Sequence, residues 1–177
     1  MASREPETTP EGATGKAEGV RPDAFRRAMA RMPTAVTVVT AFGPDGPSGL
    51  TANAVLSLSL DPPLMLAALD RGSRTLRSVE HAGRFGVNVL AAGQAKVARS
   101  FATKLEMNEK WEGIAWSERD GIPALDGILL WAACDVRDVI SGGDHVIVTG
   151  AVLDAAAGDG DPLVFYEGAY MPLSEAP

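Results

Sequence analysis

Cysteine and histidine are almost absent from this sequence, and their scarcity limits its chemistry. Cys134 is the only cysteine, so the chain can form neither an internal disulfide nor a metal site of paired cysteines. His81 and His145 are the only histidines, which excludes a metal centre built from several of them. We therefore expect a protein that holds no metal ion.

Positive charge and long apolar runs are also in short supply. The formal net charge is -7, and an acidic chain repels phosphate backbones, which argues against nucleic-acid binding. The longest apolar runs, residues 64–69 and 128–134, are too short to span a membrane. The N-terminus lacks the apolar segment of a signal peptide. These features predict a cytoplasmic protein that binds neither nucleic acid nor membranes.

Several common catalytic and nucleotide-binding motifs are missing. No G-x-G-x-x-G follows a predicted strand, and no G-x-S-x-G elbow is present. The "GATGK" at residues 12–16 is too short for a phosphate-binding loop. Asp144 and His145 form an acid–histidine pair, yet no serine has the sequence context of a nucleophile. The residues alone thus give no indication of nucleophilic catalysis.

The chain has enough apolar residues for one sizeable core. Its 177 residues are 46% hydrophobic, which suits a single domain. Residues 1–20 are rich in Glu, Thr, Pro, Gly and Ala and contain no aromatic side chain, so we expect a disordered tail there. The predicted domain spans residues 21–177.

Patterns typical of β-strands cover most of that domain. They predict strands at residues 34–42, 48–60, 64–70, 84–90, 128–140, 145–155 and 162–170. Helical spacing predicts helices at residues 23–32, 73–82 and 92–105, with Asp23 and Ser73 as N-caps. Residues 106–127 look loop-rich. Because tight turns join most strands, the order favours an antiparallel barrel over a parallel sheet.

The stretch "SGLTANAVLSLSLDPP", residues 48–63, alternates like a strand with one apolar and one polar face. The apolar face would hold Leu50, Ala52, Ala54, Leu56, Leu58 and Leu60, and the other face Thr51, Asn53, Val55, Ser57 and Ser59. No charged residue lies between Asp45 and Asp61, although a strand face in water usually carries some. The polar face is therefore either a solvent or dimer-contact surface, or a platform for a flat heteroaromatic ligand.

Three further segments allow two interpretations each. "RGSRT", residues 71–75, is either an anion site at the start of a helix or an ordinary capped helix. "ARSFATK", residues 98–104, is either a ligand contact or a basic helix face with Phe101 in the core. "GGDHVIV", residues 142–148, carries His145 either at a functional barrel rim or in an exposed hairpin turn.

Taken in this order, these segments resemble the flavin reductase family of the FMN-binding split-barrel type, the short reductases of two-component flavin monooxygenases. The matching stretches include "FRRAMARMPTAVTVVTAF", "GLTANAVLSLSLDPPLMLAAL" and "GGDHVIVTGAV", and they extend over most of residues 25–173. Such proteins often have glycine where this chain has Ala35. The resemblance implies a mainly β fold: an antiparallel six-stranded Greek-key split barrel with a few peripheral helices, assembled as a homodimer.

The resemblance also implies residue roles. His145 and Tyr170 would border the pocket for the nicotinamide cofactor, NADH or NADPH, with His145 helping to position the hydride donor. The isoalloxazine ring of the flavin, FAD or FMN, would lie against Thr51, Ala52, Asn53, Ala54, Ser57 and Ser59. The flavin phosphates would lie near Ser73, Thr75, Ser100, Phe101, Ala102 and Lys104.

The activity implied is NAD(P)H-dependent flavin reduction by hydride transfer, which supplies reduced flavin to a partner monooxygenase. Because the flavin carries this chemistry, the lack of a catalytic constellation fits the activity. Two alternatives stay open: a flavoprotein oxidase of the pyridoxamine-phosphate oxidase type, and a non-enzymatic flavin- or haem-binding barrel. The sequence leaves undecided FAD against FMN and NADH against NADPH.

Overall fold

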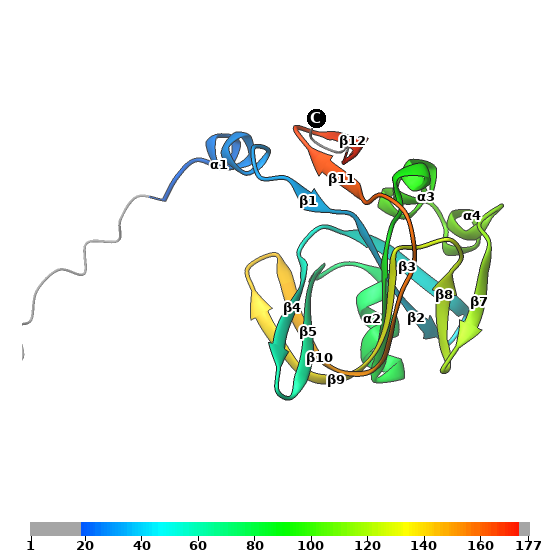
Figure 1. Ribbon diagram of the computed structural model, residues 1–177. Coiled ribbons are helices and arrows are strands. Elements are labelled where there is room, and N and C mark those ends of the chain that lie inside the picture. Colours follow the sequence, from blue (N-terminus) through cyan, green and yellow to red (C-terminus); the bar gives the residue numbers. More distant parts are fainter. Residues whose placement is uncertain (1–18, 174–177) are drawn as a thin grey trace, which may run out of the picture.

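The computed structural model describes residues 19–173, and strands dominate them (Figure 1). Most of the predicted tail, residues 1–20, and the last four residues of the predicted domain lie outside the described residues. The strands are β1 Thr34–Ala35, β2 Thr37–Gly43, β3 Gly46–Ala52, β4 Val55–Leu60, β5 Pro63–Asp70, β6 Arg84–Val89, β7 Trp116–Arg119, β8 Ile122–Leu125, β9 Leu130–Gly142, β10 His145–Ala157, β11 Leu163–Tyr166 and β12 Ala169–Pro172. The helices are α1 Pro22–Met29, α2 Arg74–Ala82, α3 Ala95–Ala102, which follows the short 3-10 turn η1 Ala92–Gln94, and α4 Met107–Trp111.

The main sheet is antiparallel and closes on itself as a barrel. Its strand order is β3-β2-β6-β9-β10-β5-β4, so β3 and β4 form its two edges. These two strands are consecutive in the chain and are separated only by Asn53 and Ala54. The N–H of Ala68 in β5 donates to the carbonyl oxygen of Ala54 at 2.9 Å, directly beside the bend. Counted as one bent strand, β3 and β4 complete a six-stranded barrel, which confirms the predicted fold.

The predicted single strand at residues 48–60 is wrong in one respect, because the chain bends in its middle. Alternation restarts after the bend, and the pairing of β4 with β5 shifts register between Ser57 and Ser59. The leucines of β4 therefore lie outside the core, and Leu60 is 89% exposed. Val55, which was assigned to the polar face, packs against the barrel core instead.

Three apolar clusters fill the described fold. One occupies the barrel and includes Val39 and Phe85, a second lies beneath α3 and β11 and includes Val38 and Phe101, and a smaller third cluster lies between β8 and β9. A side chain at Gly49 of β3 would meet the Phe101 ring at 2.6 Å, so glycine there lets α3 pack closely on the barrel. The helix α3 is thereby fixed beside β3.

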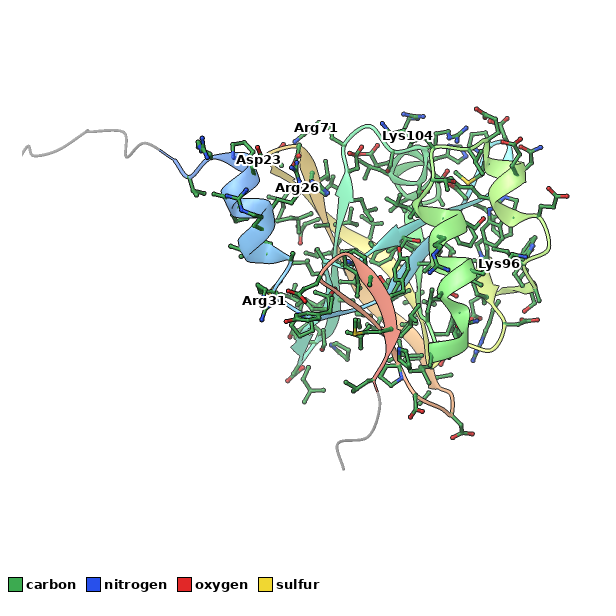
Figure 2. All side chains as sticks on the ribbon, turned by 90° about the horizontal axis from the view of Figure 1, so that it is seen from above. Asp23, Arg26, Arg31, Arg71, Lys96 and Lys104 are labelled. Atoms are coloured by element: carbon green, nitrogen blue, oxygen red, sulfur yellow. The ribbon has the colours of Figure 1, made fainter. Side chains whose placement is uncertain are left out.

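Two helical regions differ from the sequence prediction. The helix α1 begins at Pro22 with Arg21 as its N-cap, and Asp23 lies inside the first turn, where it pairs with Arg26 at 3.0 Å. Asp23 is therefore not the cap, because proline at the first helical position already starts the helix. Residues 106–127 are not mainly loop, since they contain α4 and the hairpin of β7 and β8. In both figures α1 stands to one side of the barrel (Figures 1 and 2).

Candidate functional site

A cleft of about 850 Å³ separates α1 from the barrel. The face of α1 forms one wall, and the other wall combines the bend after β3, the turn between β9 and β10, and the β11–β12 hairpin. The cleft is lined by Pro22, Phe25, Arg26, Arg27, Met29, Ala30, Met32, Thr34, Asn53, Asp144, Phe165, Glu167 and Gly168. Segments far apart in the sequence therefore meet at one mostly apolar cleft that carries a few polar groups, as ligand sites generally do.

The turn between β9 and β10 is held in place by Arg71. Nη2 of Arg71 donates to Oγ of Ser141 at 3.1 Å and to the carbonyl oxygens of Gly143 at 3.2 Å and His145 at 3.3 Å. The N–H of Arg71 donates to the carbonyl oxygen of Asp144 at 3.1 Å. Gly143 has a φ of 70°, a conformation that glycine adopts without strain. This tight turn is thus tied to the start of α2.

His145 begins β10 at the edge of the cleft. Its Nδ1 is 2.8 Å from Oδ1 of Asp144, and 46% of its side chain is exposed. The hydrogen bond with His145 lowers the pKa of the Asp144 carboxyl group, so Asp144 stays ionised and orients the ring. With Nδ1 engaged, Nε2 is the ring nitrogen left to meet a ligand.

The predicted flavin contacts around the bend fall into four environments. Asn53 lines the cleft, while Ala52 is buried in the barrel core. Oγ1 of Thr51 donates to the carbonyl oxygen of Ala98 at 2.7 Å, which ties β3 to α3. The other three predicted contacts, Ala54, Ser57 and Ser59, are at least partly exposed. Of the residues predicted here, only Asn53 directly faces the cleft wall formed by α1.

The predicted phosphate contacts cluster near the start of α2 and the end of α3. Oγ of Ser73 accepts from the N–H of Leu76 at 3.0 Å, which confirms its predicted role as the N-cap. Thr75 is 1% exposed, and its hydroxyl shares a 3.0 Å hydrogen bond with Ser48. Oγ of Ser100 donates to the carbonyl oxygen of Lys110 at 2.8 Å. The hydroxyls of Thr75 and Ser100 therefore already have partners within the chain.

The remaining predicted residues differ in accessibility. Phe101 is fully buried, as in the interpretation that set it in the core. Ala102 is exposed at the end of α3. Lys104 is exposed two residues later (Figure 2). Tyr170 is partly buried against Phe165, with ring centroids 5.2 Å apart, and this burial raises the pKa of the tyrosine hydroxyl. Tyr170 thus reaches the cleft only through Phe165, which lines it.

Sequence reasoning missed a buried lysine. Lys110 in α4 is buried, and its Nζ donates to the carbonyl oxygen of Phe101 at 3.3 Å. Burial lowers the pKa of the Lys110 ammonium group, and the neighbouring Arg74 lowers it further. Lys110 lies in the segment 106–127, which is predicted to be loop-rich. Its position beside Trp111, with Trp116 nearby, is the sequence signal that this segment packs against the core.

Residues 19–173 contain no group of three or more His, Cys, Asp or Glu side chains arranged to hold a metal ion. They also contain no helix that is long and apolar enough to cross a membrane.

Comparison with known proteins identifies the family. Residues 29–174 match the family described as "Flavin reductase like domain". The chain is 43% identical over 138 residues to a probable flavin reductase of Rhizobium meliloti (strain 1021), and the match covers 77% of this chain but only 44% of that longer relative. It is 37% identical over 158 residues to the reductase subunit of a flavin-dependent monooxygenase of Mycobacterium tuberculosis (strain CDC 1551 / Oshkosh), covering 87% of this chain and 83% of that one.

A solved structure of the same kind has a closely similar fold. The NADH:FAD oxidoreductase of Streptomyces globisporus, in complex with NAD and FAD fragments, is 32% identical, with a TM-score of 0.82. The match covers 90% of this chain and 98% of that chain. The chain described here belongs to the flavin reductase family.

Proposed function

We propose that this chain is an NAD(P)H-dependent flavin reductase that uses FAD or FMN and supplies reduced flavin to a partner monooxygenase. One observation carries the proposal: in a member of the flavin reductase family, Asn53 and the turn of Asp144 and His145 meet at one cleft of about 850 Å³. The cytoplasm is the proposed location, because the reaction consumes NAD(P)H.

The residues around the cleft fit a flat heteroaromatic ring. Phe165, Met29 and Met32 supply apolar surface, while Asn53 supplies an amide that can donate and accept hydrogen bonds at the ring edge. A bound flavin takes a hydride from the nicotinamide ring, so the protein has to hold two rings face to face rather than provide a nucleophile. The predicted contacts Thr51, Ala52 and Ala54 flank Asn53, and we propose that the backbone of this segment approaches the ring. Ser57 and Ser59 extend the polar surface along β4.

An anionic flavin tail fits the region between α2 and α3. The ammonium group of Lys104 is exposed there, and the N-terminus of α2 begins at Ser73. Positive charge and free N–H groups at a helix start attract phosphate. Thr75, Ser100 and Phe101 shape this region from within, because their side chains are engaged or buried. Ala102 offers backbone groups at its surface.

His145 and Tyr170 are proposed to border the nicotinamide ring. Asp144 orients the imidazole of His145 and leaves Nε2 for the cofactor. Arg71 fixes the turn that carries Asp144 and His145. His145 therefore helps to seat the hydride donor and needs no proton transfer of its own, since a hydride moves without a proton.

We also propose that the protein is a homodimer. Leu56, Leu58 and Leu60 are exposed along β4, and Val139 and Ile140 are exposed on β9 of the same sheet. An apolar surface of this kind on a small barrel is typical of a covered interface. A second copy packed there would also narrow the cleft beside Asn53.

The activity is tested by anaerobic mixing of the purified chain with NADH or NADPH and an excess of free flavin. We expect the flavin absorbance to bleach over many turnovers with FAD, FMN or both. Folded protein that oxidises neither nicotinamide cofactor in the presence of flavin would rule out the proposed reductase. Stoichiometric bleaching alone would favour a flavoprotein that keeps its flavin.

The role of His145 is tested with His145→Ala. We expect the KM for NAD(P)H to rise, or the rate of flavin reduction to fall, by about five- to one hundred-fold, which corresponds to a lost hydrogen bond of roughly 1–3 kcal/mol. FMN affinity should change much less. The control is His81→Ala, which removes the only other histidine. A collapse of flavin binding with unchanged NAD(P)H dependence would assign His145 to the flavin instead.

A further inference from the structure

Lys110 of α4 is a buried cation that the proposed reaction does not use. It is 4% exposed, and among residues 19–173 its ammonium group pairs with no carboxylate. Removing a cation from water is unfavourable unless polar groups of the protein replace the lost hydration. The polar contacts of Lys110 therefore indicate what the buried charge does.

These contacts join α4 to the end of α3. Nζ of Lys110 donates to the carbonyl oxygen of Phe101 at 3.3 Å, in the last turn of α3. Carbonyl groups of a last turn have no partner within their own helix, and the helix dipole makes this end negative, so an ammonium group is favourable there. In return, Oγ of Ser100 donates to the carbonyl oxygen of Lys110 at 2.8 Å. The two helices, which lie side by side in Figure 1, thus exchange hydrogen bonds.

The ring of Phe101 fixes the same point of the backbone against the barrel. Phe101 is fully buried, and a side chain at Gly49 of β3 would meet its ring at 2.6 Å. The ring also packs edge-on against Trp111, with centroids 4.8 Å apart. The backbone of Phe101 is therefore held through its ring and through its carbonyl oxygen, and Lys110 supplies the contact to the carbonyl oxygen.

The segment that follows Phe101 carries two of the proposed phosphate contacts. Ala102 and Lys104 are exposed within three residues of it. At the far end of this segment Arg74 of α2 donates to the carbonyl oxygen of Leu105. The exposed stretch thus lies between two fixed points of the backbone, and the first of them depends on the buried lysine.

We propose that Lys110 is a positioning residue that holds residues 102–104, from within the fold, in the shape that binds the flavin phosphate. The inference rests on the proposed reductase function and on the phosphate contacts proposed with it. A phosphate site gains affinity when its cation and N–H groups are already in place, since less conformational entropy is lost on binding. Lys110 itself does not touch the flavin, because its ammonium group is buried against Phe101.

The test compares FMN with riboflavin, which lacks the phosphate. Dissociation constants are measured on the full chain by quenching of flavin fluorescence, for Lys110→Met, for Lys104→Gln and for the variant with both substitutions. Methionine keeps an unbranched apolar side chain and removes the donor. The matched control is Lys96→Gln, which removes an exposed positive charge from α3 (Figure 2).

We expect the native chain to bind FMN more tightly than riboflavin. Lys110→Met should weaken FMN binding about ten-fold, as for one charge-assisted hydrogen bond, and leave riboflavin binding within about two-fold. In the Lys104→Gln background the same substitution should cost less than about two-fold, because both residues act through one segment. Amide hydrogen exchange at residues 102–106 should become faster in Lys110→Met. Lys96→Gln should leave both affinities within about two-fold.

A lysine that only stabilises the fold would give a different result. Equal losses for FMN and riboflavin, a full further loss in the Lys104→Gln background, or unchanged FMN binding in folded Lys110→Met would overturn the inference. If Lys110→Met does not fold, Ser100→Ala breaks the other hydrogen bond between the two helices and is judged by the same criteria. Flavin-dependent NADH oxidation by the native chain tests the reductase proposal separately, because fluorescence quenching requires no turnover.

Discussion

The helices α1 and α2 are alike in length and pattern but differ in what supports them. Both place apolar residues at helical spacing, yet α2 buries Leu76 and Val79 against the barrel, whereas no residue of α1 is buried. Ser73 caps α2, and Gly83 ends it in the left-handed conformation. The helix α1 has no side-chain cap, and Phe25 on it is 55% exposed.

The difference shows that an amphipathic pattern predicts a helix without fixing what covers its apolar face. Helices this short are marginal in water, so their stability comes from packing. The barrel supplies that packing for α2. The described residues supply little packing for α1. The proposed flavin and the proposed second subunit would cover its apolar face.

The largest effect should follow from removing the packing of α2. Leu76→Ala is expected to lower the free energy of unfolding by about 2–5 kcal/mol, because it leaves a cavity against the barrel. Urea unfolding followed by circular dichroism measures the loss. A decrease under about 1 kcal/mol would mean that α2 contributes as little as α1.

Loss of the α2 cap should cost less. Ser73→Ala removes the acceptor for the N–H of Leu76 and is expected to lower the free energy of unfolding by roughly 1 kcal/mol. The same urea titration measures it, with Ser73→Asp as the control that retains an acceptor. If both variants are equally destabilised, the hydroxyl contributes through something other than capping.

Arg71 precedes α2 and binds the turn that carries His145. Its substitution tests whether the well-packed α2 side of the barrel also holds this turn in place beside the cleft. Arg71→Met keeps the apolar stem but removes the three hydrogen bonds of Nη2. We expect faster amide hydrogen exchange at residues 141–146 and an approximately three- to ten-fold higher KM for NAD(P)H, as for one lost hydrogen bond. Arg71→Lys should recover part of the effect. Unchanged exchange would show that the turn holds its shape unaided.

Truncation of α1 side chains should matter little to the isolated chain. Phe25→Ala is expected to change the free energy of unfolding by less than about 0.5 kcal/mol at low protein concentration, as for an exposed residue. With flavin present, or at concentrations where a dimer forms, the loss should grow. A loss of several kcal/mol in dilute solution would show that α1 already packs on the barrel.

The smallest effect is expected from the predicted tail. Deletion of residues 1–20 should leave the melting temperature and the turnover rate unchanged, because a segment of this composition buries too little apolar surface to offset the entropy of ordering. Differential scanning calorimetry and the flavin assay check this. A clear drop in the melting temperature or in the turnover rate would show that residues 1–20 contribute to stability or activity.

The regular strands were the part of the fold that could be predicted from the sequence. The predicted strands 64–70, 84–90 and 128–140 agree with β5, β6 and β9 to within two residues. Each is an apolar or β-branched run that ends at glycine, proline or charged residues, and such signals are local. Both ends of α2 could be predicted equally well, because Ser73 is a typical N-cap residue and Gly83 a typical residue at a helix C-terminus.

The bend between β3 and β4 and the packing of α4 could not be predicted in the same way. Alternation in residues 48–60 continues across Asn53 and Ala54 with no break in the letters, and only pairing with β5 reveals the change of face. Lys110 and Trp111 of α4 both contact Phe101 of α3 through tertiary packing. The candidate flavin contacts came from the family resemblance, and the structure shows which of them are exposed.

The strand order of the barrel has a consequence for its synthesis. The first half of the chain yields the strands β6-β2-β3 and β4-β5, which are joined only at the bend between β3 and β4. In the main sheet they are bridged by β9 and β10, which span residues 130–157. A ribosome must therefore release almost the whole chain before β5 and β6 gain their second neighbours. Until that moment two unpaired strand edges are open to wrong partners, so the nascent chain is most vulnerable to aggregation just before β9 emerges.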